Sequence, residues 1–139
     1  MEQALGSLTV RARRQGLFEI TEEIAAWVAR QKVRDGLLTV FIRHTSASLL
    51  IQENVDVEVQ RDLEDFMTKL VPESDTNYRH DAEGLDDMPA HIKGALTQTH
   101  LGVPVSSGRL MLGRYQGIFL FEHRRSPRPR ELFLHLIGE

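Results

Sequence analysis

The chain has 139 residues, of which 41% are hydrophobic and 27% charged, as expected for a single domain covering residues 1–139. It contains no cysteine, which excludes disulfide scaffolds, thiolate zinc sites and cysteine nucleophiles, so any metal must be bound by His, Asp or Glu. The formal net charge of −3 argues against a general nucleic-acid-binding protein.

The first half of the chain carries patterns of strands and helices. Ser7–Arg13 alternates apolar and polar residues, as a half-buried strand does. Glu22–Gln31 begins with acidic residues and has one apolar stripe, which predicts a helix. Leu37–Arg43 is rich in apolar and β-branched residues, which predicts a central strand. A second helix is predicted from Asn54, a capping residue, to just before Pro72.

The second half opens with a polar stretch, residues 73–87, which we predict to be a long surface loop. A third helix is predicted over Pro89–His100. From Leu101 onward, short apolar runs separated by Gly, Pro and Ser predict antiparallel strands. About three helices and about seven strands, grouped rather than alternating, favour an α+β fold: a β-sandwich of mostly antiparallel strands decorated with helices.

A polar segment, Arg43-His44-Thr45-Ser46, directly follows the predicted central strand. A cation, two hydroxyl groups and backbone N–H groups are the donors that a phosphate or a carboxylate needs. The alternative is a polar turn in which Ser and Thr bond to their own backbone.

Four of the six histidines lie in polar sequence contexts: His44, His80, His91 and His123. Imidazole is the main metal-binding side chain left to a chain without cysteine. Because these residues are dispersed along the sequence, the alternative is a set of separate surface or capping histidines.

An arginine-rich stretch runs from Glu122 to Arg130. It is either a solvated hairpin tip or a rim that gathers anions, because a guanidinium matches a phosphate bidentately. We expect Glu122 and Arg124 to be buried partners, and Arg125 and Arg128 to be solvated.

The sequence lacks the signals that mark several classes of protein. The sequence has none of the common nucleotide-binding, α/β-hydrolase or zincin motifs. Its apolar stretches are much shorter than the roughly 20 residues of a membrane-spanning helix, so we expect no membrane partner. The first residues lack the basic and apolar regions of an export signal, so we expect a cytoplasmic protein.

Taken in order along the chain, these segments resemble the YjbQ family, also called the secondary thiamine-phosphate synthase family. The resemblance spans nearly the whole chain and rests on His44-Thr45-Ser46-Ala47, Glu53-Asn54, Pro72, Tyr78, His80-Asp81, Met88-Pro89-Ala90-His91-Ile92-Lys93, Val103-Pro104-Val105, Gly108–Gly113, Gln116-Gly117-Ile118, Glu122-His123-Arg124 and Gly138-Glu139.

The resemblance implies a homotrimer built on a β-sandwich, with histidines that cluster in a cleft and are suited to a divalent metal such as zinc or magnesium. It also implies thiamine-phosphate synthase-like activity, in which a hydroxymethylpyrimidine diphosphate is joined to a thiazole phosphate with loss of pyrophosphate. The site residues carried over by the resemblance are His44, Thr45, Ser46, His80, His91, Glu122 and Arg124.

The leading hypothesis is therefore an enzyme acting on a phosphate-bearing small molecule. Its leaving diphosphate would be neutralised by a cation or by the anion-binding residues Arg43, Thr45, Ser46 and Arg124. The predicted catalytic residues are His44, His80, His91 and Glu122, of which the three histidines are also the predicted metal ligands and Glu122 is expected to orient one of them.

Two other readings stay open at this stage. A non-catalytic metal- or anion-binding module would use the same residues without turnover. An interaction protein without a site would place His44, His80 and His91 on separate surfaces.

Three positions depart from the family pattern. Asp87 stands where members often carry Asn, and it adds a negative charge that would favour a bound cation. Arg114 and Tyr115 stand where members commonly carry Thr and Trp, so position 114 supports no inference about catalysis.

Overall fold

The computed structural model describes residues 1–74 and 77–139 and contains eight strands and three helices in those parts. In chain order they are β1 (Glu2–Val10), β2 (Gly16–Glu19), α1 (Thr21–Ala29), β3 (Gly36–Ile42), β4 (Ala47–Glu53), α2 (Val57–Leu70), α3 (Asp87–Leu96), β5 (His100–Ser106), β6 (Arg109–Leu110), β7 (Gln116–Glu122) and β8 (Arg130–Gly138).

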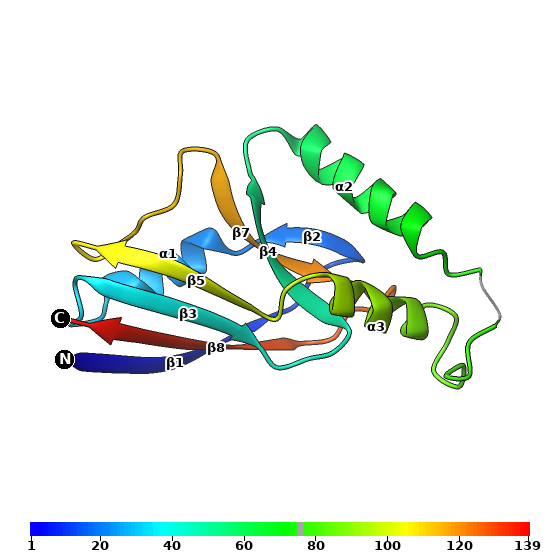
Figure 1. Cartoon of the computed structure of the whole chain (residues 1–139), viewed down its shortest axis with the longest axis horizontal. Coiled ribbons are helices and arrows are strands. Elements are labelled where there is room, and N and C mark those ends of the chain that lie inside the picture. The colour runs from blue at the N-terminus through cyan, green and yellow to red at the C-terminus, as the bar shows by residue number, and fades with distance from the viewer. Residues whose placement is uncertain (75–76) are drawn as a thin grey trace.

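The strands form two sheets whose pairings are antiparallel throughout the described residues. The larger sheet has the order β1-β8-β3-β5-β6 and the smaller one β2-β7-β4. Both termini lie at one end of the larger sheet, and α3 lies beyond its other end (Figure 1). The predicted α+β architecture is confirmed.

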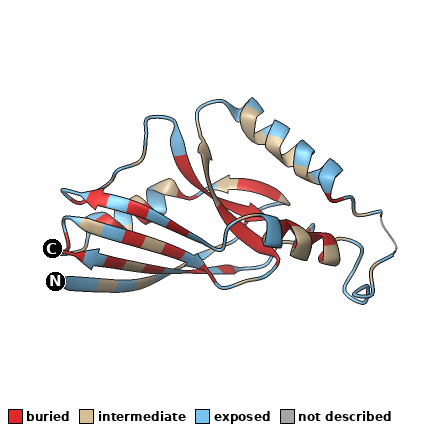
Figure 2. Cartoon of the chain, in the orientation of Figure 1, coloured by how far each residue is buried: buried red, intermediate tan, exposed pale blue. Residues whose placement is uncertain are grey.

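The main core lies between the two sheets and α1. Along β3, Leu38, Val40 and Ile42 are buried, and the residues between them are not. This alternation is visible as separate red bands along the strands of the larger sheet (Figure 2). Helix α1 contributes Ile24 and Val28, both fully buried. Period-two burial leaves the other face of the larger sheet outside this core.

The outer face of the smaller sheet is covered by α2. Phe119 and Phe121 of β7 pack with Leu63 and Met67 of that helix. No residue of α2 is fully buried, so the helix rests on the sheet by one stripe only. No helix in the described parts of the chain is long and apolar enough to cross a membrane.

All three helices have boundaries that differ from prediction. Helix α1 covers Thr21–Ala29 rather than Glu22–Gln31. Helix α2 is capped by Asp56, whose carboxylate accepts the Glu58 N–H, rather than by Asn54.

Helix α3 is shorter than predicted, ending at Leu96 instead of continuing to His100. The carbonyl of Gln98 accepts the Leu49 N–H at 2.7 Å, so the backbone after the helix is used in pairing with β4. A contact between distant residues therefore overrides the local helical pattern.

Strand β4 was not predicted. It is buried on both faces at its start, from Ala47 to Leu49, so it lacks the alternation that marks a half-buried strand. Its strand conformation is fixed by pairing with β7 along its whole length.

Candidate functional site

A pocket of about 470 Å³ lies where the β3–β4 connection, the start of α3 and the β7–β8 connection meet. Its lining consists of Arg43, His44, Thr45, Ser46, Glu83, Asp87, His91, Arg124, Arg128, Pro129 and Arg130. Every predicted site residue except His80 and Glu122 is in this lining. The His80 ring lies beside that of His91, with ring centroids 5.4 Å apart. The three predicted histidines are thus at one place rather than on separate surfaces.

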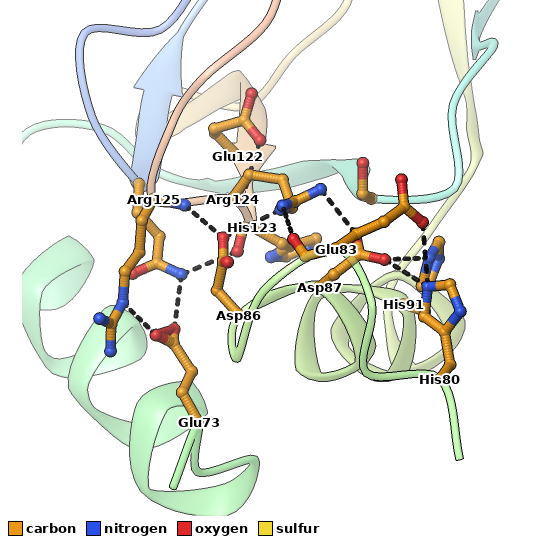
Figure 3. Close-up of polar contacts among 12 residues, drawn as sticks. Glu73, His80, Glu83, Asp86, Asp87, His91, Glu122, His123, Arg124 and Arg125 are labelled. Atoms are coloured by element: carbon orange, nitrogen blue, oxygen red, sulfur yellow. Dashed lines mark hydrogen bonds and ion pairs between the residues drawn. The ribbon is translucent and has the colours of Figure 1, made fainter. Parts of the chain in front are cut away.

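Three metal-ligating side chains converge at the edge of this pocket. His80, Asp87 and His91 each offer one donor atom, and the three atoms lie within 4.8 Å of one another (Figure 3). His80 Nε2 is 2.5 Å and His91 Nε2 is 3.3 Å from Asp87 Oδ2. The Glu83 carboxylate lies 3.2 Å from His80 Nε2. Asp87 and His91 are four residues apart on α3, so they share one helix face.

The orientation of the His91 ring is set by the polar segment after β3. Its Nδ1 lies 3.2 Å from the carbonyl oxygen of Thr45. A carbonyl only accepts, so Nδ1 carries the hydrogen and Nε2 of the neutral ring carries a lone pair. That lone pair faces the Asp87 carboxylate, an arrangement that is favourable only with a second proton or a cation between them.

Arg124 holds the acidic residues in place. It is 7% exposed, and its guanidinium donates to Asp86 Oδ2 at 2.9 Å, to Asp87 Oδ1 at 2.6 Å and to the Glu83 carbonyl at 2.9 Å. Burial by itself would raise the pKa of Asp87, but the His80 hydrogen bond and the Arg124 charge outweigh it and lower that pKa. The carboxylate therefore stays ionised. These three bonds use three of the five N–H donors of the Arg124 guanidinium, so much of its hydrogen-bonding capacity is directed at internal partners.

Glu122 lies beneath the pocket rather than in its lining. It is fully buried, and its two carboxylate oxygens accept from Arg130 at 2.8 and 2.6 Å. Arg130 also donates to Ser46 Oγ at 3.0 Å and to the Ser46 carbonyl at 3.1 Å. The expectation that Glu122 hydrogen-bonds a histidine is wrong, because its partner is this buried arginine. Glu122 is connected to the site through Arg130 and the turn at Ser46, and also through Arg124, whose backbone N–H donates to Glu122 Oε2 at 3.1 Å.

His44 lines the pocket but is not one of the three converging donors. Its Nε2 accepts the backbone N–H of Glu131 at 2.8 Å. Burial and the charge of Arg130 lower the pKa of His44, so the ring is neutral near pH 7. The structure thus separates it from His80 and His91, with which it was grouped as a metal ligand.

His123 is buried under the site. Its Nε2 lies 2.9 Å from Ser48 Oγ, and the Thr97 hydroxyl lies 2.6 Å from the same oxygen. Burial and the charges of Lys93 and Arg130 lower the pKa of His123 to about 3. This fully buried neutral imidazole joins the end of β7 to Ser48 of β4, and it is not in the pocket lining.

Arg125 and Arg128, which were expected to be solvated, are both exposed. Arg125 nevertheless contacts two acidic residues. Its side chain is 66% exposed and forms an ion pair with Glu73, and its backbone N–H donates to Asp86 at 2.9 Å. Arg128 is exposed and forms no hydrogen bond or ion pair with any residue that the structure describes.

Residues 6–139 match the family model described as UPF0047 protein YjbQ-like. The chain belongs to the YjbQ/UPF0047 family. It is 51% identical over 132 residues to UPF0047 protein sll1880 of Synechocystis, covering 95% of this chain and 90% of the relative. It is 43% identical to UPF0047 protein YjbQ of Escherichia coli O157:H7, covering 96% of each chain.

Two solved structures are similar to this one. The conserved hypothetical protein TT1486 of Thermus thermophilus has a TM-score of 0.85 at 35% identity, covering 95% of this chain and 99% of that chain. A protein of unknown function from Sulfolobus solfataricus has a TM-score of 0.89 at 22% identity and covers 99% of both chains, which shows the fold alone. The names of these relatives state no activity.

Of the three residues that depart from the YjbQ pattern, one lies in the pocket and two lie outside it. Asp87 supplies the carboxylate at the centre of the donor cluster, where Asn would supply only a neutral oxygen. Arg114 and Tyr115 lie between β6 and β7, with the guanidinium 5.9 Å from the Tyr115 ring, and neither lines the pocket.

Sequence reasoning missed the role of Arg130, which it grouped with a charged turn. A signal was present, because Arg130 is in period-two phase with the buried Leu132, Leu134 and Leu136 of the same strand. It also missed Asp86 as a partner of Arg124, since the sequence does not show which loop residue faces that arginine.

Proposed function

We propose that this protein is a small enzyme that acts on a phosphate-bearing small molecule, with a divalent cation bound by His80, Asp87 and His91. The observation that carries the proposal is the orientation of His91. Its Nδ1–H donates to Thr45, and its Nε2 lone pair faces the Asp87 carboxylate at 3.3 Å. A metal ion can accept electron pairs from both of these atoms and from His80 Nε2 at once, whereas a proton bridges only two atoms.

The donor set fits such an ion. Two imidazoles and one carboxylate, His80, His91 and Asp87, suit zinc or another transition metal better than magnesium, which prefers oxygen ligands. The other oxygen of Asp87 is held by Arg124, an outer contact of the kind that orients metal-binding carboxylates. When bound, the ion would supply Lewis-acid stabilisation of developing negative charge.

The remaining pocket residues support an anionic substrate. Arg43 is 58% exposed, lies 3.8 Å from Glu131 and keeps donors free for a ligand. The exposed Thr45 offers its hydroxyl beside the site. Ser46 and Arg124 have internal partners and serve to shape the pocket.

The specific reaction we propose within this class is thiamine-phosphate synthase-like transfer with loss of pyrophosphate, in line with the family resemblance. Pocket cations would neutralise the leaving diphosphate, whose charge grows in the transition state. A non-catalytic metal- or anion-binding module is the alternative, and it differs only in the absence of turnover.

Metal binding is tested first. We expect purified protein freed of metal to bind about one Zn²⁺ per chain in calorimetry, and His91→Ala to weaken binding by about 10–100-fold or more because one ligand is lost. His100→Ala removes an exposed imidazole outside the cluster and is the matched control. Equal affinity of His91→Ala and the wild type would contradict the metal site.

Turnover is tested second. The zinc-loaded protein is incubated with hydroxymethylpyrimidine diphosphate and thiazole phosphate, and released pyrophosphate is measured. Release that is lost in His80→Ala supports the transferase. Zinc binding without any pyrophosphate release favours the binding module.

We also propose that the protein assembles as a homotrimer. The outer face of the larger sheet carries two directly paired apolar couples, Leu37 with Ile137 and Phe41 with Phe133. All four side chains are more than a third exposed. Exposed apolar couples of this kind on one sheet face of a small protein favour a subunit interface.

A further inference from the structure

The pocket contains cationic groups that the internal structure does not use. Four arginines line it, but Arg124 and Arg130 are committed to buried carboxylates. Arg43 has only a 3.8 Å contact with Glu131, and Arg128 has no partner within the described residues. Arg43 and Arg128 come from the β3–β4 and β7–β8 connections, whereas the proposed metal donors come from α3 and the loop before it.

His44 lies next to Arg43 in this lining, and its hydrogen-bonding role is fixed. The Glu131 backbone N–H only donates, so Nε2 of His44 must carry a lone pair. The single hydrogen of the neutral ring is therefore on Nδ1. Nδ1 has no partner among the described residues. A nitrogen that carries a hydrogen cannot bind a metal, so His44 is a hydrogen-bond donor to a ligand and not a fourth metal donor beside His80, Asp87 and His91.

We propose that His44, Arg43 and Arg128 form an anion subsite that binds the terminal phosphate of the substrate, beside the cation site of His80, Asp87 and His91. This inference rests on the proposed function, since it defines how the same pocket recognises its ligand. It changes the role of His44 from metal ligand to hydrogen-bond donor, and it adds Arg128, which had been assigned to a solvated turn.

The number and kind of donors favour a phosphate. Two guanidinium groups and one N–H match the three terminal oxygens of a phosphate monoester, whereas a carboxylate has only two oxygens. A pocket of about 470 Å³ is far larger than a phosphate and lies in the range of pockets that hold small organic molecules. The ligand is therefore a phosphorylated organic molecule rather than the free ion.

Binding to the metal-free protein tests this subsite independently of the metal. The chain is kept in chelator and titrated with phenyl phosphate, with benzoate as the carboxylate probe. We expect phenyl phosphate to bind and His44→Gln and Arg128→Gln each to weaken it about tenfold or more, because charge-assisted or pocket-facing hydrogen bonds are lost.

The variants have built-in controls. A glutamine at position 44 can keep an acceptor for the Glu131 N–H, so an unchanged melting temperature is expected. Arg109→Gln removes an exposed arginine of β6, outside the pocket, and should leave binding unchanged. Equal binding of phenyl phosphate by either pocket variant and the wild type would overturn the proposal, as would equal binding of benzoate and phenyl phosphate.

A nitrogen NMR measurement separates this subsite from the metal site. At neutral pH, the His44 ring should carry its hydrogen on Nδ1. The chemical shifts of its two ring nitrogens should not change when Zn²⁺ is added. A zinc-induced shift of the His44 Nε2 signal like that of His91 would overturn its role as a donor. If no histidine responds to zinc while phenyl phosphate still binds, the metal part of the proposed function fails and the anion subsite stands.

Discussion

The Glu122–Arg130 pair is the buried ionic link of the site. Both side chains are at most 2% exposed, and two hydrogen bonds of 2.6 and 2.8 Å join them. A buried pair is costly to form but much more costly to break, because one charge then remains without a partner. Arg130 also donates a hydrogen bond to Ser46. The buried pair therefore fixes the turn in which the neighbouring Thr45 carbonyl orients His91.

The substitution Glu122→Gln keeps the side-chain shape and removes the charge. We expect a loss of about 3 kcal/mol in the free energy of unfolding, measured with urea, because Arg130 is left buried and uncompensated. Glu131→Gln changes an exposed carboxylate on the next strand and should cost less than about 1 kcal/mol. A stable Glu122→Gln protein with impaired zinc binding would show that Glu122 serves the site directly.

His123 predicts a pH dependence of stability. Its pKa is about 3 in the folded chain and about 6.5 when unfolded, so the unfolded state binds more protons between these values. Stability is full above about pH 6.5 and falls as the pH is lowered toward 3, by about 1 kcal/mol per pH unit.

We expect urea unfolding between pH 7 and pH 4 to show a steeper loss for the wild type than for His123→Gln, which removes this group. Identical slopes for the two proteins would mean that His123 takes up a proton in the folded state.

At the scale of elements, α3 and β7 are joined through the loop before the helix. Arg124, just after β7, bonds Asp86 and Asp87 at the start of α3. Gly94 brings the same helix close to the turn after β3, since an added Cβ would lie 2.9 Å from the Thr45 carbonyl. The helix is thereby held from two sides, which fixes both Asp87 and His91.

Asp86 makes this connection sensitive to acid. Burial alone would raise the pKa of Asp86, but hydrogen bonds from Arg124 and the Arg125 backbone lower it below the ordinary 3.8. A lowered carboxyl pKa contributes stability that is present above about pH 4 and is lost as the pH falls through the folded value.

We expect Asp86→Asn to lower stability by about 1–2 kcal/mol at pH 7 and by less at pH 2.5, as measured by thermal melting. Asp62→Asn, at an exposed position of α2, is the control and should have little effect at either pH. An equal loss at both pH values would show that the charge of Asp86 is not what matters.

At the scale of the whole molecule, the larger sheet has one face in the core and one face outside it that exposes several apolar side chains. The paired couples Phe41 with Phe133 and Leu37 with Ile137 lie on this outer face. Helix α2 adds Phe66 and Leu70, which are 61% and 54% exposed. Such an apolar surface is expected to be covered when copies of the chain associate.

We expect Phe41→Glu to shift the assembly toward the monomer in sedimentation at micromolar concentration, because a charge would be buried at the interface. Glu22→Gln, at an exposed position of α1, a helix that packs against the other face of the larger sheet, should leave the assembly unchanged. A wild-type chain that sediments as a monomer would contradict the trimer itself.

The sequence by itself determined the fold class and the segments of the site. Apolar runs marked β3 and β8, and helical periodicity marked the existence of all three helices, because burial leaves a trace in the pattern of apolar residues along the chain. The sequence also predicted His80, His91 and the polar segment after β3 as parts of the site. Strand β4 and the end of α3 were not predicted correctly, because their conformation depends on pairing with distant residues, as Leu49 pairs with Gln98.

Only the tertiary structure decided which residues act together. The histidines looked equivalent in sequence, but the folded chain directs His91 toward Asp87, occupies His44 Nε2 with a backbone N–H and buries His123. Likewise, it paired Glu122 with Arg130 instead of a histidine. The role of a polar side chain depends on the direction of its donors and acceptors in space, and residue type and spacing do not record that direction.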